Sequence, residues 1–145
     1  MEYRIMEHRQ SGLTIYARLD KGEEILTSLT KLAEECQIVC AEVNGLGATD
    51  KFTVGAYSIP DKQYFRNTFE GVYEITSLHG TITRMDDKPY LHLHMTAGGL
   101  DGSVKGGHLN EAFISVTCEL VIHASNGRIN RQKDAETGIN LFHFD

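Results

Sequence analysis

The sequence predicts one α+β domain, in which a mixed, mainly antiparallel sheet carries one main helix packed on it. Two observations lead to this fold class. A single segment near the N-terminus has apolar residues at helical spacing, and nearly everything after it has the composition and period of strands separated by turns. The chain has 145 residues, which suits one domain over residues 1–145 with its own core.

The first element expected is a pair of strands within residues 1–20. Apolar residues alternate with mostly polar ones from Leu13 to Leu19, so one face of the second strand should point to the core. The helix follows over residues 23–36. Its apolar positions recur at spacings of three and four and form one stripe: Ile25, Leu26, Leu29, Leu32, Ala33 and Cys36.

Strands are then expected over most of the remaining chain. The predicted ranges are 38–43, 52–59, 64–69, 73–84, 90–97, 113–123 and 140–144. Residues 86–89 are typical of a hairpin turn and residues 125–127 of another turn. Residues 98–107 hold five of the 14 glycines and are predicted to form a loop, which would be the mobile part of the domain.

Composition excludes several classes of protein. The 14 basic residues are outnumbered by 20 acidic ones, for a net charge of -6, so nucleic-acid phosphates should repel the chain unless a local basic patch prevails. The most basic stretch, residues 128–133, is interpreted as a solvated turn or strand edge.

No apolar run is long enough for a bilayer and no signal core begins the chain, so we expect a cytoplasmic protein without membrane contact.

The cysteines give no sign of a disulfide framework or of a thiolate zinc site. There are three, Cys36, Cys40 and Cys118, and no two of them are spaced as Cys-x-x-Cys. We interpret them as buried thiols that behave as small hydrophobic side chains.

The histidines carry the clearest chemical signal. His92 and His94 alternate with Leu91, Leu93 and Met95, so both imidazoles should project from one face of a strand. The glycine-rich segment that follows could return the chain so that His108 joins them. Three neutral imidazoles suit zinc or another divalent metal, with a fourth position left for water, a carboxylate or a ligand.

Other uses of these residues stay open. A His-x-His pair can also be exposed, or buried and hydrogen-bonded, without any metal. His8, His79, His123 and His143 lack metal-ligand spacing and are assigned no role. Glu42, Glu74 and Arg84 are candidates for a fourth ligand or for substrate contacts. The segment 44–48, Asn-Gly-Leu-Gly-Ala, is a weak nucleotide-binding signal and more typical of a strand bend.

Five segments in this order resemble the plants-and-prokaryotes-conserved (PPC) domain, over nearly the whole chain. They are Gly22–Glu24, Ala41–Ala48, Gly71–Gly80, Leu91–His94 and Gly106–Leu109. The resemblance implies an α+β sandwich assembled as a homotrimer, with a metal, usually zinc, on the three histidines. It also implies a fold similar to that of acetolactate decarboxylase, a zinc enzyme with a His-x-His pair and a later histidine.

In plants the domain follows an AT-hook that binds AT-rich DNA, and free-standing prokaryotic members are commonly labelled DNA-binding by that association. This chain has two prolines, Pro60 and Pro89, and neither lies in an Arg-Gly-Arg-Pro segment. Direct DNA binding by this chain is therefore not expected.

Three functions are consistent with the sequence. The first is a metal-binding homotrimer that works through a small-molecule ligand or a protein partner. The second is a metal-dependent enzyme, a lyase or hydrolase acting at His92, His94 and His108, with Glu42 or Glu74 as the first carboxylate to consider. The third is a DNA-associated regulator that acts through partners. For the trimer, Phe113, Val116 and Leu120 are the predicted subunit contacts.

Overall fold

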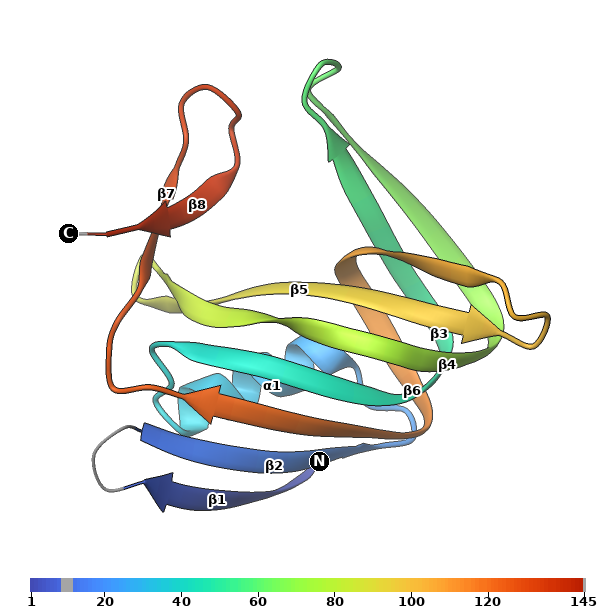
Figure 1. Cartoon of the computed structure of the whole chain (residues 1–145), viewed down its shortest axis with the longest axis horizontal. Coiled ribbons are helices and arrows are strands. Elements are labelled where there is room, and N and C mark those ends of the chain that lie inside the picture. Colours follow the sequence, from blue (N-terminus) through green and yellow to red (C-terminus); the bar gives the residue numbers. More distant parts are fainter. Residues whose placement is uncertain (9–11, 145) are drawn as a thin grey trace.

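The computed structural model describes residues 1–8 and 12–144, and most of them lie in β-strands (Figure 1). Strands take 70% of the chain and helix 8%. In chain order the elements are β1 Glu2–His8, β2 Gly12–Asp20, α1 Ile25–Glu35, β3 Ala41–Ser58, β4 Gln63–Met85, β5 Lys88–Gly99, β6 Val104–Ala124, β7 Asn130–Lys133 and β8 Asn140–His143.

The predicted α+β class is therefore wrong, because the fold is mainly β with one short helix. The helix has 11 residues, whereas β3, β4 and β6 have 18, 23 and 21. Segments with the composition of turns proved to be parts of these strands. In β3, for example, the register against β4 shifts between Gly45 and Gly47, so a bulge bends the strand where the sequence favours a bend.

One sheet contains all eight described strands, in the order β1-β2-β6-β3-β4-β7-β8, and β5 pairs with both β4 and β6. Every pairing is antiparallel except the short contact between β4 and β7, where Arg84 lies opposite Asn130. The strand β6 pairs with β5 through residues 104–108 and with β3 from residue 108 onward. The sheet is thus strongly curved, so that β5 lies between β4 and the first part of β6.

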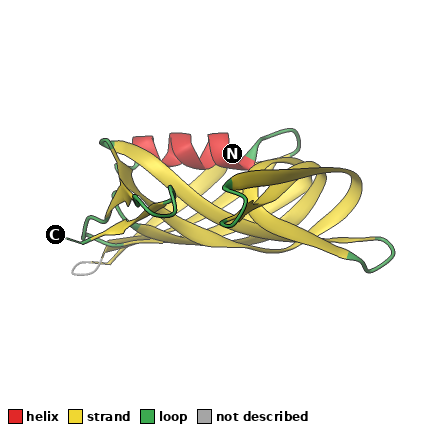
Figure 2. Ribbon diagram, turned by 90° about the horizontal axis from the view of Figure 1, so that it is seen from above, coloured by secondary structure: helices red, strands yellow, loops and turns green. Residues whose placement is uncertain are grey.

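The helix α1 lies along one face of the sheet (Figure 2), close to the range predicted for it. Its N-terminus is capped by Glu24, whose carboxylate accepts hydrogen bonds from the backbone N–H of Leu26 and Thr27 at 3.0 and 2.7 Å. Leu29 and Leu32 of the helix are fully buried against the sheet. They belong to a core that also includes Ile15, Leu19, Val43, Leu93 and Ile122.

Alternation along the strands places the polar side chains on the other face of the sheet. Val43 and Leu93 are buried, while their neighbours Glu42, Asn44 and His94 are exposed. The candidate site therefore lies on the face of the sheet that faces away from the core.

Two predicted turns have different outcomes. Asp86 and Asp87 connect β4 to β5 with positive φ angles of 50° and 61°, as in the tightest hairpins, so the predicted hairpin is confirmed. The predicted loop over residues 98–107 is wrong. Gly99 ends β5, Val104 begins β6, and the turn between them is closed by a 2.9 Å hydrogen bond from Gly99 N to Ser103 O.

The single helix found in residues 1–8 and 12–144 is too short to cross a membrane.

Candidate metal centre

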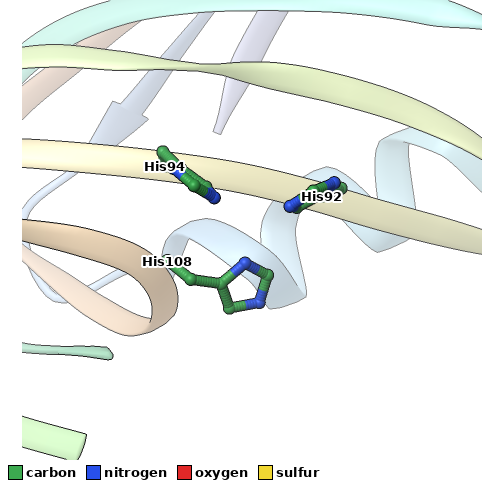
Figure 3. Close-up of side chains that lie close together, drawn as sticks. All are labelled: His92, His94 and His108. Carbon is green, nitrogen blue, oxygen red and sulfur yellow. The ribbon is translucent and has the colours of Figure 1, made fainter. Parts of the chain in front are cut away.

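The three predicted histidines come together from two paired strands (Figure 3). His92 and His94 lie two residues apart on β5 and project from the same face. The antiparallel register between β5 and β6 places His108 directly opposite His94. Strand period and strand register thus bring the third imidazole to the first two, without the flexible loop that the sequence suggested.

The imidazole rings surround a common point. Ring centroids are 5.2 Å apart for His92 and His94, 5.2 Å for His92 and His108, and 5.5 Å for His94 and His108. One ring nitrogen from each lies within 4.8 Å of the others. Nitrogen ligands of tetrahedral zinc are about 3.4 Å apart, so small rotations of the side chains would bring these nitrogens to coordination distance.

Burial keeps two of the imidazoles in the neutral form. The pKa of His92 is lowered to about 4, first by burial and then by the charge of Arg131 and by the two neighbouring imidazoles. Burial also lowers the pKa of His108, with His94 contributing. Neutral imidazole is the form that coordinates a metal. His94 is exposed, so solvent reaches the group from its side.

The carboxylates proposed from the sequence lie outside this group. Glu42 is opposite Thr81, which is in turn opposite His92, and its carboxylate accepts a 2.8 Å hydrogen bond from Asn44. Glu74 lies opposite Gly98 at the far end of β5. Within the described part of the chain, the histidine group contains no aspartate, glutamate or cysteine.

The third residue suggested for a fourth ligand or a substrate contact, Arg84, also lies apart from the histidines. It is opposite Pro89, near the start of β5. Its guanidinium donates a 3.2 Å hydrogen bond to the carbonyl of Asp87 in the adjoining turn. The structure thus gives Arg84 a role in the β4–β5 hairpin.

A fourth histidine, His79, adjoins the group and was assigned no role from the sequence. It lies opposite His94 in the pairing of β4 with β5, and the two ring centroids are 6.3 Å apart. Its Nδ1 atom is 3.2 Å from the Ser77 hydroxyl. The sequence could have identified His79, because a two-residue turn at Asp86 and Asp87 sets the strand register that pairs His79 with His94.

Arg131 is the second residue that the sequence did not identify. We expected residues 128–133 to be solvated, but Arg131 is only 8% exposed, so that interpretation is wrong for it. Its guanidinium donates hydrogen bonds to the hydroxyls of Thr83 and Thr81 at 2.9 and 3.2 Å. Because Thr81 lies opposite His92, a buried cation stands beside the histidine group.

The backbone beside His108 is packed too closely for a side chain. Gly107 has φ of 158°, and a Cβ atom there would lie 2.7 Å from the carbonyl oxygen of Gly55 in β3. The ring of Tyr64 meets His108 edge-on, at 6.2 Å between centroids, and its hydroxyl donates a 3.1 Å hydrogen bond to Asn110. These contacts fix the end of β6 that carries His108.

Solved structures of several proteins share this fold over almost the full chain. A candidate DNA-binding protein of Bacteroides thetaiotaomicron is 30% identical, with a TM-score of 0.90 over 98% of this chain and 97% of its own. The metal-containing protein of Archaeoglobus fulgidus is 29% identical, with a TM-score of 0.86 over 99% and 97%. A plant- and prokaryote-conserved protein of Pyrococcus horikoshii is 27% identical, with a TM-score of 0.83 over 99% and 95%.

The comparison with curated proteins finds no match. The family comparison does: residues 6–126 match the model of the Plants and Prokaryotes Conserved (PCC) domain, which confirms the resemblance seen in the sequence. With the histidine geometry and the shared fold in hand, we conclude that the chain belongs to the Plants and Prokaryotes Conserved domain family.

Proposed function

We propose that this chain is a metal-binding module that holds one divalent ion, zinc, between His92, His94 and His108 and leaves one coordination position open to a small ligand. The observation that carries the proposal is the convergence of three imidazoles without a carboxylate or thiol among the described residues of the group. A structural zinc site is closed by four protein ligands, whereas a site with three protein ligands keeps a place for water or substrate.

The donor set supports zinc over the harder divalent ions. Imidazole nitrogen suits zinc, copper, iron and nickel, whereas magnesium and calcium prefer oxygen ligands. The Archaeoglobus relative with the same fold is a metal-containing protein, and the low pKa of His92 keeps that donor neutral at pH 7. When bound, such an ion supplies a Lewis acid that polarises a carbonyl or acidifies a water molecule.

The fold does not require the metal to hold the ligands in place. His94 and His108 are already opposite each other in a hydrogen-bonded ladder, and the turn between β5 and β6 is closed by its own backbone hydrogen bonds. A purely structural metal would hold a loop against the sheet, but the β5–β6 turn is already held by these hydrogen bonds. This favours an ion that acts on a ligand over one that acts as a clamp.

A metal-dependent enzyme, a lyase or a hydrolase, is the second candidate function. His79 favours it, because this exposed imidazole lies next to His94 and is held by Ser77. An imidazole in that position could take up or release a proton near the open side of the group.

DNA binding receives less support. The Bacteroides relative is a candidate DNA-binding protein, but this chain carries 20 acidic and 14 basic residues. Phosphate neutralisation needs an excess of basic side chains at the contact, so we propose that any role of this chain at DNA runs through a partner.

Metal analysis of variants tests the proposed function. The protein purified after expression with zinc should hold about one ion per chain, and replacing His92 and His94 together by alanine should abolish its retention. His143→Ala, which removes a histidine of β8, is the matched control and should retain the full amount. Full metal content in the double variant would contradict the proposal.

A further inference from the structure

Arg131 is a buried cation for which residues 1–8 and 12–144 supply no ionic partner. Its side chain is 8% exposed, and among the described residues no carboxylate contributes to its electrostatic environment or forms an ion pair with it. Burying an unpaired charge is costly, and buried arginines are usually matched by a carboxylate. In place of a carboxylate, aromatic rings and neutral oxygen acceptors surround this charge, so its positive charge is not neutralised by a described residue.

Two aromatic rings and three hydrogen bonds surround the guanidinium of Arg131. The ring of Phe142 covers one face, with its centroid 4.5 Å from Cζ, and Tyr90 lies 4.7 Å away. Of the five N–H groups, three donate to Thr83, Thr81 and the carbonyl of Asn140. The described part of the chain supplies no acceptor for the other two N–H groups, and a partner must approach them in the plane of the guanidinium.

The position of Arg131 ties its guanidinium to the histidine group. Its Nη2 atom donates to Thr81, the residue directly opposite His92, and side chains opposite each other on paired strands lie about 5 Å apart at Cβ. Tyr90, which packs on the guanidinium, is two residues from His92 on the same strand. A ligand of a few atoms could therefore reach both places.

The element that supplies Arg131 lies outside the part of the chain matched by the family model. The model ends at residue 126, and Arg131 lies on β7, which forms a hairpin with β8 beside the ends of β4 and β5 (Figure 1). A groove of about 310 Å³ is lined by Thr81, Thr83 and Phe142, which contact Arg131, and also by Glu42. That carboxylate would repel an anion, so the histidine side is the favoured side for one.

We propose that Arg131 and the metal of the histidine group form a two-point site for a small organic ligand that carries a carboxylate. The inference rests on the proposed function, because the ion is one of the two points. A carboxylate is planar and pairs with guanidinium N–H groups edge to edge, which is the approach that the aromatic rings leave open. The ligand's second donor, a hydroxyl or carbonyl oxygen, would occupy the open coordination position.

Calorimetric titration of the zinc-loaded full chain tests the proposal. Glycolate and glycolamide have the same size and the same hydroxyl, but only glycolate has a carboxylate. We expect Arg131→Gln to keep its zinc and to bind glycolate at least about tenfold more weakly than the unmodified chain, with glycolamide unaffected. Arg128→Gln makes the same change at an exposed arginine paired with Asp87 and should leave both affinities unchanged.

The result that overturns the inference is an Arg131→Gln protein with full zinc and unaltered glycolate affinity. If that variant does not fold, the unmodified protein provides the test. The ¹⁵N resonance of Arg131 Nε should shift when glycolate is added and should not shift with glycolamide. A resonance that does not move at saturating glycolate contradicts the site. Metal analysis separates the two claims. Zinc retained without an Arg131 effect refutes only the inference, whereas absence of zinc refutes the proposed function and the two-point site together.

Discussion

His92 shows how a single side chain is prepared for coordination. The strand places it on the outer face of the sheet, where it is half-buried, and burial is the largest cause of its low pKa of about 4. An imidazole that stays neutral through the physiological range offers its lone pair to a metal without first losing a proton. The same burial affects His108, so two donors are ready at neutral pH.

The lowered pKa predicts how the metal-free protein responds to acid. In the unfolded chain His92 has the ordinary histidine pKa of about 6.5, whereas in the folded chain its pKa is about 4. The folded state therefore loses stability relative to the unfolded state as the pH falls from about 6.5 to about 4. Urea unfolding of metal-free protein at pH 7.5 and pH 4.5 measures the loss.

His92→Gln is the control for this prediction, since several carboxylates also titrate in that range. The variant lacks the titrating imidazole, so its unfolding free energy should decrease less between pH 7.5 and pH 4.5 than that of the unmodified chain. Equal decreases in the two proteins would show that His92 has no lowered pKa in the folded state.

The sequence predicted the site residues that share one strand and missed those that neighbouring strands bring to the site. His92 and His94 share a face because they are two residues apart. The glycine-rich segment after them indicated that the chain could bring His108 to the same place. His79 reaches the group through the pairing of β4 with β5, and Arg131 through the pairing of β4 with β7. Register depends on the turn type, and a single residue of error moves a side chain to the opposite face.

Among the elements, the helix and the hairpin at residues 86–87 were predictable because their signals are local. The lengths of β3, β4 and β6 were not. Bulges interrupt the alternation of apolar and polar residues, as between Thr49 and Lys51, and one end of each long strand leaves the core. The alternation of buried and exposed residues therefore ends before the strand ends. The sequence predicted seven strands after the helix, whereas the structure has six in its described residues, and β3, β4 and β6 are the long ones.

The contact between β4 and β5 supports the site and can be tested at Gly80. This residue has φ of 155°, and a Cβ atom would lie 2.0 Å from the carbonyl oxygen of His92. Gly80→Ala must push β5 away, so we expect a loss of about 3 kcal/mol in the free energy of unfolding together with weaker zinc retention. Chemical denaturation and metal analysis measure the two effects.

Gly127→Ala is the matched control. A Cβ atom at Gly127 meets no other atom within 4 Å, so the free energy of unfolding should change by less than about 0.5 kcal/mol. If Gly80→Ala is as stable as this control, the close approach of β4 to β5 is not a constraint on the site.

For the whole molecule, the homotrimer implied by the family resemblance stays a prediction. Of the predicted contacts, Val116 is 69% exposed, whereas Leu120 is 1% exposed and lies at the base of a surface groove. Exposed apolar side chains also gather on the face of β1, β2 and β3, where Tyr3, Tyr16 and Leu46 line this groove of about 790 Å³. A second copy would cover that surface.

We predict a particle of three times the chain mass of 16.2 kDa in light scattering at micromolar concentration. Leu46→Asp should lower the mass toward that of one chain, because it places a charge in the apolar groove. Lys21→Asp changes an exposed residue outside the groove and should leave the mass unchanged. A monomer mass for the unmodified chain would refute the trimer.

In the proposed metal centre, His92, His94 and His108 bind one metal ion and leave a coordination position open. X-ray absorption spectroscopy at the zinc edge of the purified, zinc-loaded protein tests it most directly. We expect three imidazole nitrogens and one light, exchangeable ligand at about 2.0–2.1 Å, and a changed spectrum when glycolate is added. A shell that contains sulfur at about 2.3 Å, or one made of oxygen alone, would contradict it.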